Sequence, residues 1–489
     1  MQEPLSTRPR VSGASCYCRT LPVAGIETLA GRKVDLLAVH DLFPERYPHF
    51  LESAATGTPQ ARYNILFAFP GETLRLEADG RIKGPLSEGE DNDFLDAFDR
   101  WWCSQELSTS DKGENLPPFT GGWFVYLGYE LAGQIEPSLN LPVAPGDMPV
   151  AFATRFPAAI IFDHEAGEII LMTESESESL LDDMEADLRR ACKGAATLAP
   201  VSVEDSCLVG ELIEDTPERH LDGARQCIDY VFAGDVFQVN LSRLWKGTLR
   251  PDISHGELYD RLRRRNPAPF AGMATLDGMA IISSSPERLI EVRGSLIQTR
   301  PIAGTRPRGA SGITDVALSS ELIGHPKERA EHIMLVDLER NDISRVCIPG
   351  SVHVNEMMVV ESYAHVHHIV SNVRGELASA ITPGEVVRAV FPGGTITGCP
   401  KVRCMEILAE LEAEGRGPYT GAMGYVNRDG SLDLNILIRT MLRQGNEVRF
   451  RAGGGIVADS DPQKELEETR AKARGLIRAL TQGGTRGEE

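Results

Sequence analysis

Two pairs of glutamates, with members three residues apart, have the spacing best suited to chemistry in this chain. Glu328 and Glu331 lie on one predicted helix, and Glu465 and Glu468 lie on another near the C-terminus. Residues three apart share a helix face, so each pair presents its carboxylates together. Facing each other, the four acids would form an all-oxygen site suited to Mg²⁺. From the spacing alone, solvent-exposed helix faces are the commoner explanation.

Groups able to bind anions precede the second pair. Arg439 comes near the end of a strand predicted over 434–440, where a guanidinium can hold a carboxylate by two parallel hydrogen bonds. A solvent-facing arginine would give the same pattern. Consecutive glycines let backbone N–H groups approach an anion closely, and a tight turn is the alternative. Three of them follow a strand predicted over 447–451: Gly453, Gly454 and Gly455.

A histidine cluster and a turn rich in glycine and threonine are further candidates. His365 and His367 would share one face of a strand and His368 the other, so at most one is interpreted as catalytic and the rest as buried structural histidines. The segment 392–401 leads into a helix predicted over 402–412. Its hydroxyls and the helix N-terminus could hold an anion, and a capping turn is the alternative.

The elements that must position these residues indicate an α+β fold. Short runs bounded by glycine and proline predict strands over 62–69, 73–76, 122–127, 159–161, 168–172, 236–246, 271–276 and 279–284. Helices are predicted over 93–103, 178–192 and 217–232, and others begin at Pro326 and after Asp461-Pro462. Arg428-Asp429-Gly430 predicts a hairpin. Strands and helices do not alternate regularly, which favours antiparallel sheets.

A small, polar segment divides the chain near its middle. Residues 193–207 contain few large apolar side chains and one proline, so the main boundary is placed there. The predicted organisation is a poorly determined segment at 1–30, an N-terminal region at 31–200, a second domain at 208–482 that carries the candidate site residues, and a polar tail at 483–489.

Composition restricts the classes of function. The 489 residues include 50 Lys and Arg against 71 Asp and Glu, which gives a formal net charge of −21. Such a charge argues against binding to nucleic acid or to an anionic membrane. It permits an anionic substrate, because a few local cations can outweigh the average field. Apolar residues make up 42%, enough for a sizeable core.

Membrane spans and export signals are not evident in the sequence. No run approaches the roughly 18 apolar residues of a spanning helix, and the N-terminus has no apolar segment typical of a signal peptide. The 9 cysteines show no zinc-site spacing, and Cys16-x-Cys18 is the only tight pair. We therefore expect a cytoplasmic protein with reduced thiols.

Taken in order, the motifs of the second half resemble the chorismate-binding domain shared by anthranilate synthase component I, aminodeoxychorismate synthase component I and isochorismate or salicylate synthases. The combination is very specific, and the first half resembles the aminating members more loosely. The stretches that carry the resemblance are Ser285-Pro-Glu287-Arg, 299–305, 327–332, 337–342, His368-Ile-Val-Ser, 392–401, Gly417-Pro-Tyr419, Ile438-Arg-Thr440, Gly453–Gly455 and Glu465-x-x-Glu468-Thr-x-x-Lys472.

The resemblance implies a large fold of antiparallel sheets packed in a sandwich with helices outside. It also implies that Glu331 and Glu468 bind Mg²⁺, with Glu328 and Glu465 acting through water. Glu287 would be the general acid that helps the ring hydroxyl leave, which suits a poor leaving group. His368 and Thr395 would line the reacting ring. The carboxylates of chorismate, a dianion, would be held by Tyr419, Arg439, Gly453, Gly454, Gly455 and Lys472.

Features of the sequence point to two different branches of the family. Several second-half motifs, together with 61–65 and 119–130, resemble the aminodeoxychorismate-forming branch, which serves folate synthesis. Ala303 is the anthranilate form, because the other branch carries a lysine there that is thought to attack the ring. We expect the aminodeoxychorismate branch, with anthranilate formation as the alternative. A non-catalytic subunit that only binds chorismate or an amino acid is a remote third possibility.

The chain shows no glutaminase-type segment, so the resemblance implies a separate glutamine amidotransferase subunit that supplies ammonia. Phe50-Leu-Glu-Ser53 resembles the tryptophan-site motif of anthranilate synthases. It indicates either a regulatory amino-acid pocket or a structural feature, and we favour the structural interpretation.

Overall fold

The structure is a computed structural model, and it describes most of the chain. The described residues are 8–9, 16–24, 34–55, 62–85, 93–107, 116–174, 177–194, 206–307, 318, 320–324, 326–362 and 366–481. The side chains at 8–9, 194, 303, 305–307, 326–328, 362 and 366 lie outside this description.

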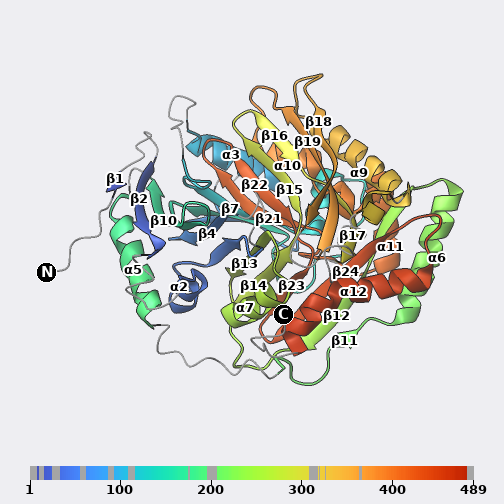
Figure 1. Cartoon of the computed structure of the whole chain (residues 1–489), viewed down its shortest axis with the longest axis horizontal. Coiled ribbons are helices and arrows are strands. Elements are labelled where there is room, and N and C mark those ends of the chain that lie inside the picture. The colour runs from blue at the N-terminus through green and yellow to red at the C-terminus, as the bar shows by residue number, and fades with distance from the viewer. Residues whose placement is uncertain are drawn as a thin grey trace.

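The described residues form two large antiparallel sheets (Figure 1). The first has 13 strands, in the order β1 (Arg8–Pro9), β2 (Cys16–Pro22), β10 (Glu168–Glu174), β9 (Ala158–Asp163), β4 (Tyr63–Ala68), β3 (His49–Glu52), β13 (Phe270–Leu276), β14 (Met279–Ser285), β23 (Thr440–Gln444), β24 (Glu447–Ile456), β12 (Gln238–Thr248) and β11 (Ile213–Glu214), with β20 (Gly398–Cys399) on β12. The second has 11 strands, in the order β17 (Ile302–Pro307), β19 (Val366–Glu376), β16 (Leu296–Thr299), β15 (Arg288–Arg293), β22 (Leu432–Ile436), β21 (Ala422–Asn427), β7 (Gly122–Leu127), β8 (Ala151–Phe156), β5 (Thr73–Leu76) and β6 (Ile82–Lys83), with β18 (His353–Ser362) on β19.

The two sheets pack face to face through an aromatic layer. Phe67 from the first sheet meets Phe124 from the second, with ring centroids 5.4 Å apart. Strand β7 is apolar throughout because both of its faces are covered: Phe124 and Tyr126 belong to the layer between the sheets, and Trp123 packs on the helix side. The expected sandwich of antiparallel sheets is confirmed.

Helices cover the outer faces of the sandwich (Figure 1). Against the first sheet pack α2 (Leu37–Leu42), α5 (Leu180–Gly194), α6 (Pro217–Ala233), α7 (His255–Arg265), α11 (Lys401–Glu412) and α12 (Pro462–Thr481). Against the second pack α3 (Phe94–Gln105), α9 (Pro326–Ser344) and α10 (Pro383–Val390). Short helical turns are η2 (Tyr129–Leu131), α4 (Ala132–Ile135) and η4 (Gly394–Ile396).

Strands from the two halves of the sequence share both sheets. In the first sheet β3 pairs with β13, and in the second β7 pairs with β21. Both pairings join residues before 195 to residues after 205. The N-terminal region is therefore built into the same core as the motif-rich second half.

The chain passes between the sheets twice at one place. Strand β14 in the first sheet leads through Glu287 to β15 in the second, and β22 in the second leads through Arg439 to β23 in the first. The two crossings are hydrogen-bonded to each other: Ser284 N donates to Arg439 O (3.1 Å), and Ile436 N donates to Glu287 O (3.0 Å). This seam brings two of the candidate site residues together.

The helices and strands predicted from the sequence agree with the structure except in strands that lead to candidate site residues. The expected helices near 93, 178, 217, 326, 402 and 462 are confirmed within a few residues, and Asp93 caps α3 through its carboxylate. The strand predicted over 434–440 is wrong. It ends at Ile436 because the chain must cross between the sheets, and Arg439 adopts a left-handed φ of 54° there.

Candidate active site

Glu287 lies buried in the first crossing of the seam. Thr395 Oγ1, on η4, donates to Glu287 Oε1 at 2.8 Å. The backbone around Glu287 is fixed by Ser285 Oγ, which donates to Ile436 O at 2.5 Å. A carboxyl group that is 6% exposed and held by a hydroxyl is well placed to exchange a proton with a bound molecule.

The protonation of Glu287 is set mainly by its burial. Burial raises the pKa of Glu287 to about 7, against the opposing effects of the Thr395 hydroxyl, the Ile302 backbone, Arg439 and Lys472. A substantial fraction of the group therefore carries its proton near neutral pH. This is the state that a general acid requires.

Arg439 and Tyr419 face the same region as Glu287. Burial lowers the pKa of Arg439, although Tyr419, Glu287 and Glu468 all act to raise it. Tyr419 is 6% exposed, and burial raises its pKa to about 12. Both side chains thus keep their protons and can donate hydrogen bonds to an anion.

The glycine triplet lies inside a strand rather than in a turn. The strand predicted over 447–451 extends to Ile456, and Gly453 to Gly455 pair with Ser242 to Asn240 of β12. The prediction of a strand that ends at 451 is therefore wrong, because the three glycines continue the backbone pairing with β12. Having no side chains, they leave the space beside the strand to other residues. A Cβ at Gly453 would lie 2.5 Å from Leu241 O and 2.8 Å from Tyr419 Oη.

Two carboxylates of α12 lie beside Gly454, the middle glycine of the triplet. A Cβ at Gly454 would lie 3.4 Å from Glu468 Oε1, 3.5 Å from Glu465 Oε2 and 3.5 Å from Lys472 Nζ. Lys472 Nζ forms an ion pair with Glu468 Oε1 at 2.6 Å and donates to Gly453 O at 3.0 Å. The structure therefore brings one glutamate pair, the lysine and the glycine strand together.

Of the two candidate carboxylates on α9, the structure describes only that of Glu331. Glu331 Oε1 accepts a hydrogen bond of 3.2 Å from Gln238 Nε2, and Gln238 fills the space beside Gly455, where a Cβ would lie 2.0 Å from that nitrogen. The side chain of Glu328 is outside the described residues. Among the described side chains, no group of three His, Cys, Asp or Glu is arranged to hold a metal ion.

Two histidines of the cluster are consecutive residues of one strand, which places their side chains on opposite faces. His367 and His368 both lie on β19; His367 is buried, and His368 is half-buried. Burial, with a smaller contribution from Arg439, lowers the pKa of His368 to about 4 against the opposing effect of the Gly304 backbone, so its imidazole is neutral at pH 7. His365 is outside the described residues.

Sequence reasoning missed the polar side chains that support the site. Asn240 Nδ2 donates to Thr395 O at 3.3 Å, and Gln238 contacts Glu331 from the same face of β12. On α9, Glu339 accepts from Thr299 Oγ1 at 3.2 Å and lies close enough to Glu287 for that carboxylate to raise the pKa of Glu339. Polar residues alternating along an otherwise apolar strand were the available signal for the first two.

A cavity lies at Ser53, and Glu287 and Arg439 do not line it. It measures about 320 Å³ and includes Phe270 and Tyr425 in its walls. Ser53 N donates to Asn64 Oδ1 and Ser53 Oγ donates to Pro269 O, both at 3.0 Å. These bonds tie the end of β3 to its neighbours.

The site thus has a buried acid with a raised pKa, two cations and a pair of carboxylates around a glycine strand. Such an arrangement can hold a small polyanion and protonate a leaving oxygen. The comparison with known proteins agrees with this chemistry. Residues 52–478 match the chorismate binding enzyme family, and the chain belongs to that family.

Relatives of known name cover most of the chain. Anthranilate synthase component 1 of Synechocystis sp. is 40% identical over 470 residues, which is 89% of this chain and 91% of that protein. Aminodeoxychorismate synthase component 1 of Bacillus subtilis is 38% identical over 469 residues, which is 92% of this chain and 97% of that protein. The crystal structure of anthranilate synthase component I from Streptococcus pneumoniae is 31% identical, with a TM-score of 0.74 over 86% of this chain and 93% of that one.

These relatives place the chain among chorismate-utilising enzymes of the anthranilate and aminodeoxychorismate synthase group. None of the helices in the described part of the chain is long and apolar enough to cross a membrane.

Proposed function

We propose that this chain aminates chorismate to 4-amino-4-deoxychorismate, as the synthase component of para-aminobenzoate and folate formation. The observation that carries the proposal is a buried Glu287, with a pKa near 7, held by Thr395 beside Arg439. The motif at 119–130, which resembles the aminodeoxychorismate branch, supports the product assignment. Its last residue, Glu130, accepts hydrogen bonds from Arg416 N (2.6 Å) and Gly417 N (3.1 Å), and so helps build the turn that carries Tyr419.

In this proposal, chorismate lies between Glu287 and the glycine strand. Arg439, Tyr419 and Lys472 hold its carboxylates, because all three donate hydrogen bonds and two of them are cations. Neutral His368 and Thr395 line the ring. A dianionic substrate needs these local cations, since the protein as a whole carries −21.

Amination exchanges one bond for another. The nitrogen of ammonia bonds to the hydroxyl-bearing ring carbon, and the C–O bond breaks with its electron pair leaving on oxygen. Glu287 gives its proton to that oxygen, so water departs. The new ammonium then loses a proton, which restores Glu287. Ala303 offers no amine for a covalent adduct, so ammonia attacks the ring directly.

Mg²⁺ is the proposed cofactor, as is general for this family. Its donors would be carboxylate oxygens of Glu331 and Glu468, with Glu328 and Glu465 acting through water. Oxygen donors suit this ion, and carboxylate oxygens of Glu465 and Glu468 both lie beside Gly454 in the structure, so two of the four donors are together. When bound, the ion would supply positive charge beside a substrate carboxylate.

Ammonia is proposed to come from a glutamine amidotransferase partner. The relatives' names designate a component 1, which supports a second component. The test is reconstitution with ammonium salt in place of the partner. Turnover with ammonium alone would place the amination chemistry on this chain.

Anthranilate formation is the second candidate, favoured by Ala303 and by the name of the Synechocystis relative. Product analysis separates the two. After incubation with chorismate, Mg²⁺ and ammonium, a product that an aminodeoxychorismate lyase converts to para-aminobenzoate supports the first candidate. Fluorescent anthranilate as the sole product would replace it with the second. Tight chorismate binding without turnover would indicate the non-catalytic alternative.

A further inference from the structure

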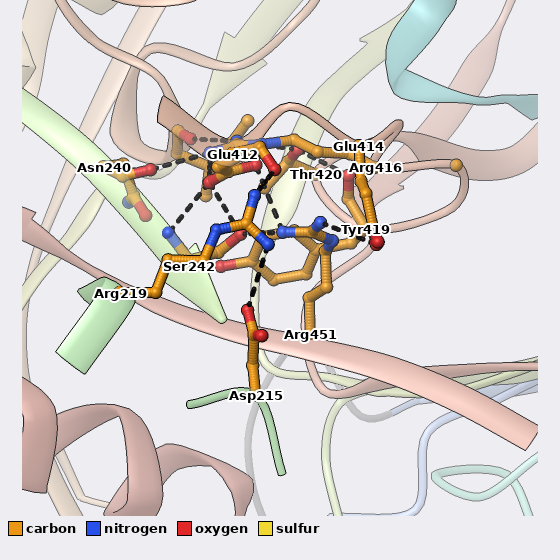
Figure 2. A network of polar contacts seen from close by, with 12 residues as sticks. Asp215, Arg219, Asn240, Ser242, Glu412, Glu414, Arg416, Tyr419, Thr420 and Arg451 are labelled. Atoms are coloured by element: carbon orange, nitrogen blue, oxygen red, sulfur yellow. Dashed lines mark hydrogen bonds and ion pairs between the residues drawn. The ribbon is translucent and has the colours of Figure 1, made fainter. Parts of the chain in front are cut away.

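A fully buried guanidinium joins two parts of the candidate site without belonging to either. The Arg416 side chain is 1% exposed and lies in the turn after α11. Glu412 holds it through both carboxylate oxygens, at 2.9 Å from Nε and 2.7 Å from Nη2. Figure 2 shows this pair beside Asn240, Tyr419 and Thr420.

On one side, Arg416 holds the backbone that carries Thr395. Its Nη1 donates to Ile396 O at 3.4 Å, and its Nη2 donates to Asn240 O at 2.8 Å. Asn240 in turn donates from Nδ2 to Thr395 O (3.3 Å) and from its backbone N to Thr397 O (3.0 Å). The turn that carries Thr395, whose hydroxyl donates a hydrogen bond to Glu287, is thus held by Arg416 and Asn240 together.

On the other side, Arg416 holds the Tyr419 turn. Its Nη1 also donates to Thr420 Oγ1 at 3.2 Å, and its guanidinium carbon lies 5.5 Å from the ring centroid of Tyr419. A second ring, Tyr129, stacks at 4.8 Å. One rigid, planar group therefore sets the distance between the Thr395 turn and the Tyr419 ring.

The charge of this group is balanced within the protein. Burial acts to raise the pKa of Glu412, but Arg416 and Arg451 outweigh it and lower that pKa to about 2. Arg451 Nη1 reaches Glu412 Oε2 at 3.2 Å, and Ser242 donates to Glu412 from N and Oγ. Since all these partners are internal, the guanidinium is fixed before any substrate arrives.

We propose that Arg416, acting with Asn240, is a positioning residue that holds Thr395 against Glu287 and Tyr419 at its substrate-binding place. Arg416 touches neither Glu287 nor, by this proposal, the substrate. The inference rests on the proposed function, because it assigns Arg416 a role in the work of Glu287 and Tyr419.

Arg416→Lys is the test, since lysine keeps the charge opposite Glu412 but has one nitrogen for five hydrogen bonds. We expect a folded protein with kcat lower by about 10-fold to 100-fold. The Thr395 hydroxyl lowers the pKa of Glu287, and other groups acting on that pKa are Arg439, Lys472 and the Ile302 backbone. The alkaline limb of the kcat profile should therefore move to higher pH, as we also expect for Thr395→Val.

The double variant Arg416→Lys/Thr395→Val should lose little more than Thr395→Val alone, because both changes break the same link. Arg451→Lys is the matched control, since it loosens Glu412 without touching Ile396 or Asn240; its pH limb should stay in place. If Arg416→Lys does not fold, Asn240→Ala removes the side-chain hydrogen bond to Thr395 O and should show the same shift.

A folded Arg416→Lys with wild-type kcat, KM and pH limb would overturn the inference, as would a lower melting temperature with an unmoved limb. Full additivity in the double variant would overturn it too. A wild-type protein that binds chorismate, as measured by calorimetry, but never aminates it would instead overturn the proposed function.

Discussion

Thr395 Oγ1 donates to Glu287 Oε1 at 2.8 Å, although the two residues are 108 positions apart in the chain. The contact joins η4 to the seam where β14 passes into β15. It gives a buried carboxyl group one polar partner while burial keeps its pKa near 7. The predictions below begin from this pair.

Glu287→Gln should lower kcat by about 10²-fold to 10⁴-fold, because the amide cannot donate the proton that the leaving hydroxyl needs. Chorismate affinity, measured by calorimetry, should change by less than about 10-fold. Glu291→Gln is the matched control, as it makes the same change at another buried glutamate, on β15. Retained turnover in Glu287→Gln would remove the acid assignment.

The pH profile should report the same group. Glu287 must be protonated to act, so kcat should fall as the pH rises through about 7. Thr395→Val removes a hydrogen bond that favours the carboxylate, so the pKa should rise and the limb should move to higher pH. A limb that moves to lower pH in Thr395→Val would contradict the geometry.

Removal of Mg²⁺ by a chelator should abolish turnover, and Glu468→Gln should raise the Mg²⁺ requirement by at least about 10-fold, because a carboxylate ligand is lost. Glu467→Gln is the control: it is the adjacent, exposed glutamate of α12. Binding of Mn²⁺, followed by electron paramagnetic resonance, gives a measurement independent of activity. Equal Mn²⁺ affinity in the two variants would disprove the metal assignment.

Ala303→Lys tests the amination route. With a lysine at this position and no ammonia, we expect chorismate to form a covalent adduct that intact-protein mass spectrometry detects, and the wild type should form none. With ammonium present, both proteins should give the 4-amino product. Anthranilate from the wild type, together with no adduct in the variant, would assign the chain to the other branch.

Glu339 should make the folded state pH-dependent. Burial, with the neighbouring Asp342, raises the pKa of Glu339 to about 8, above its ordinary value of 4.5. Its contribution to stability is therefore present below about pH 4.5 and is lost as the pH rises through 8. The melting temperature of Glu339→Gln should fall less between pH 5 and pH 8.5 than that of the wild type. Parallel curves by circular dichroism would contradict the pKa shift.

The sequence alone predicted most of the regular elements, because hydrophobic period and capping residues act locally. The helices beginning near Asp93, Pro217, Pro326 and Pro462 are examples. It also supplied the family, through motifs that keep their order from Ser285 to Lys472. Glu465 and Glu468 could be paired from spacing because they share one helix face.

Only the tertiary structure decided how the distant parts meet. The chain passes between the sheets from β14 to β15 and again from β22 to β23, which places Glu287 beside Arg439. The second passage ends a strand that the local pattern predicted as continuous. The glycine triplet stays in a strand because it pairs with β12, and a side chain at Gly453 would collide with Tyr419 from another turn. Local sequence determines how each segment folds, whereas contacts between residues more than 100 positions apart depend on how the two sheets pack.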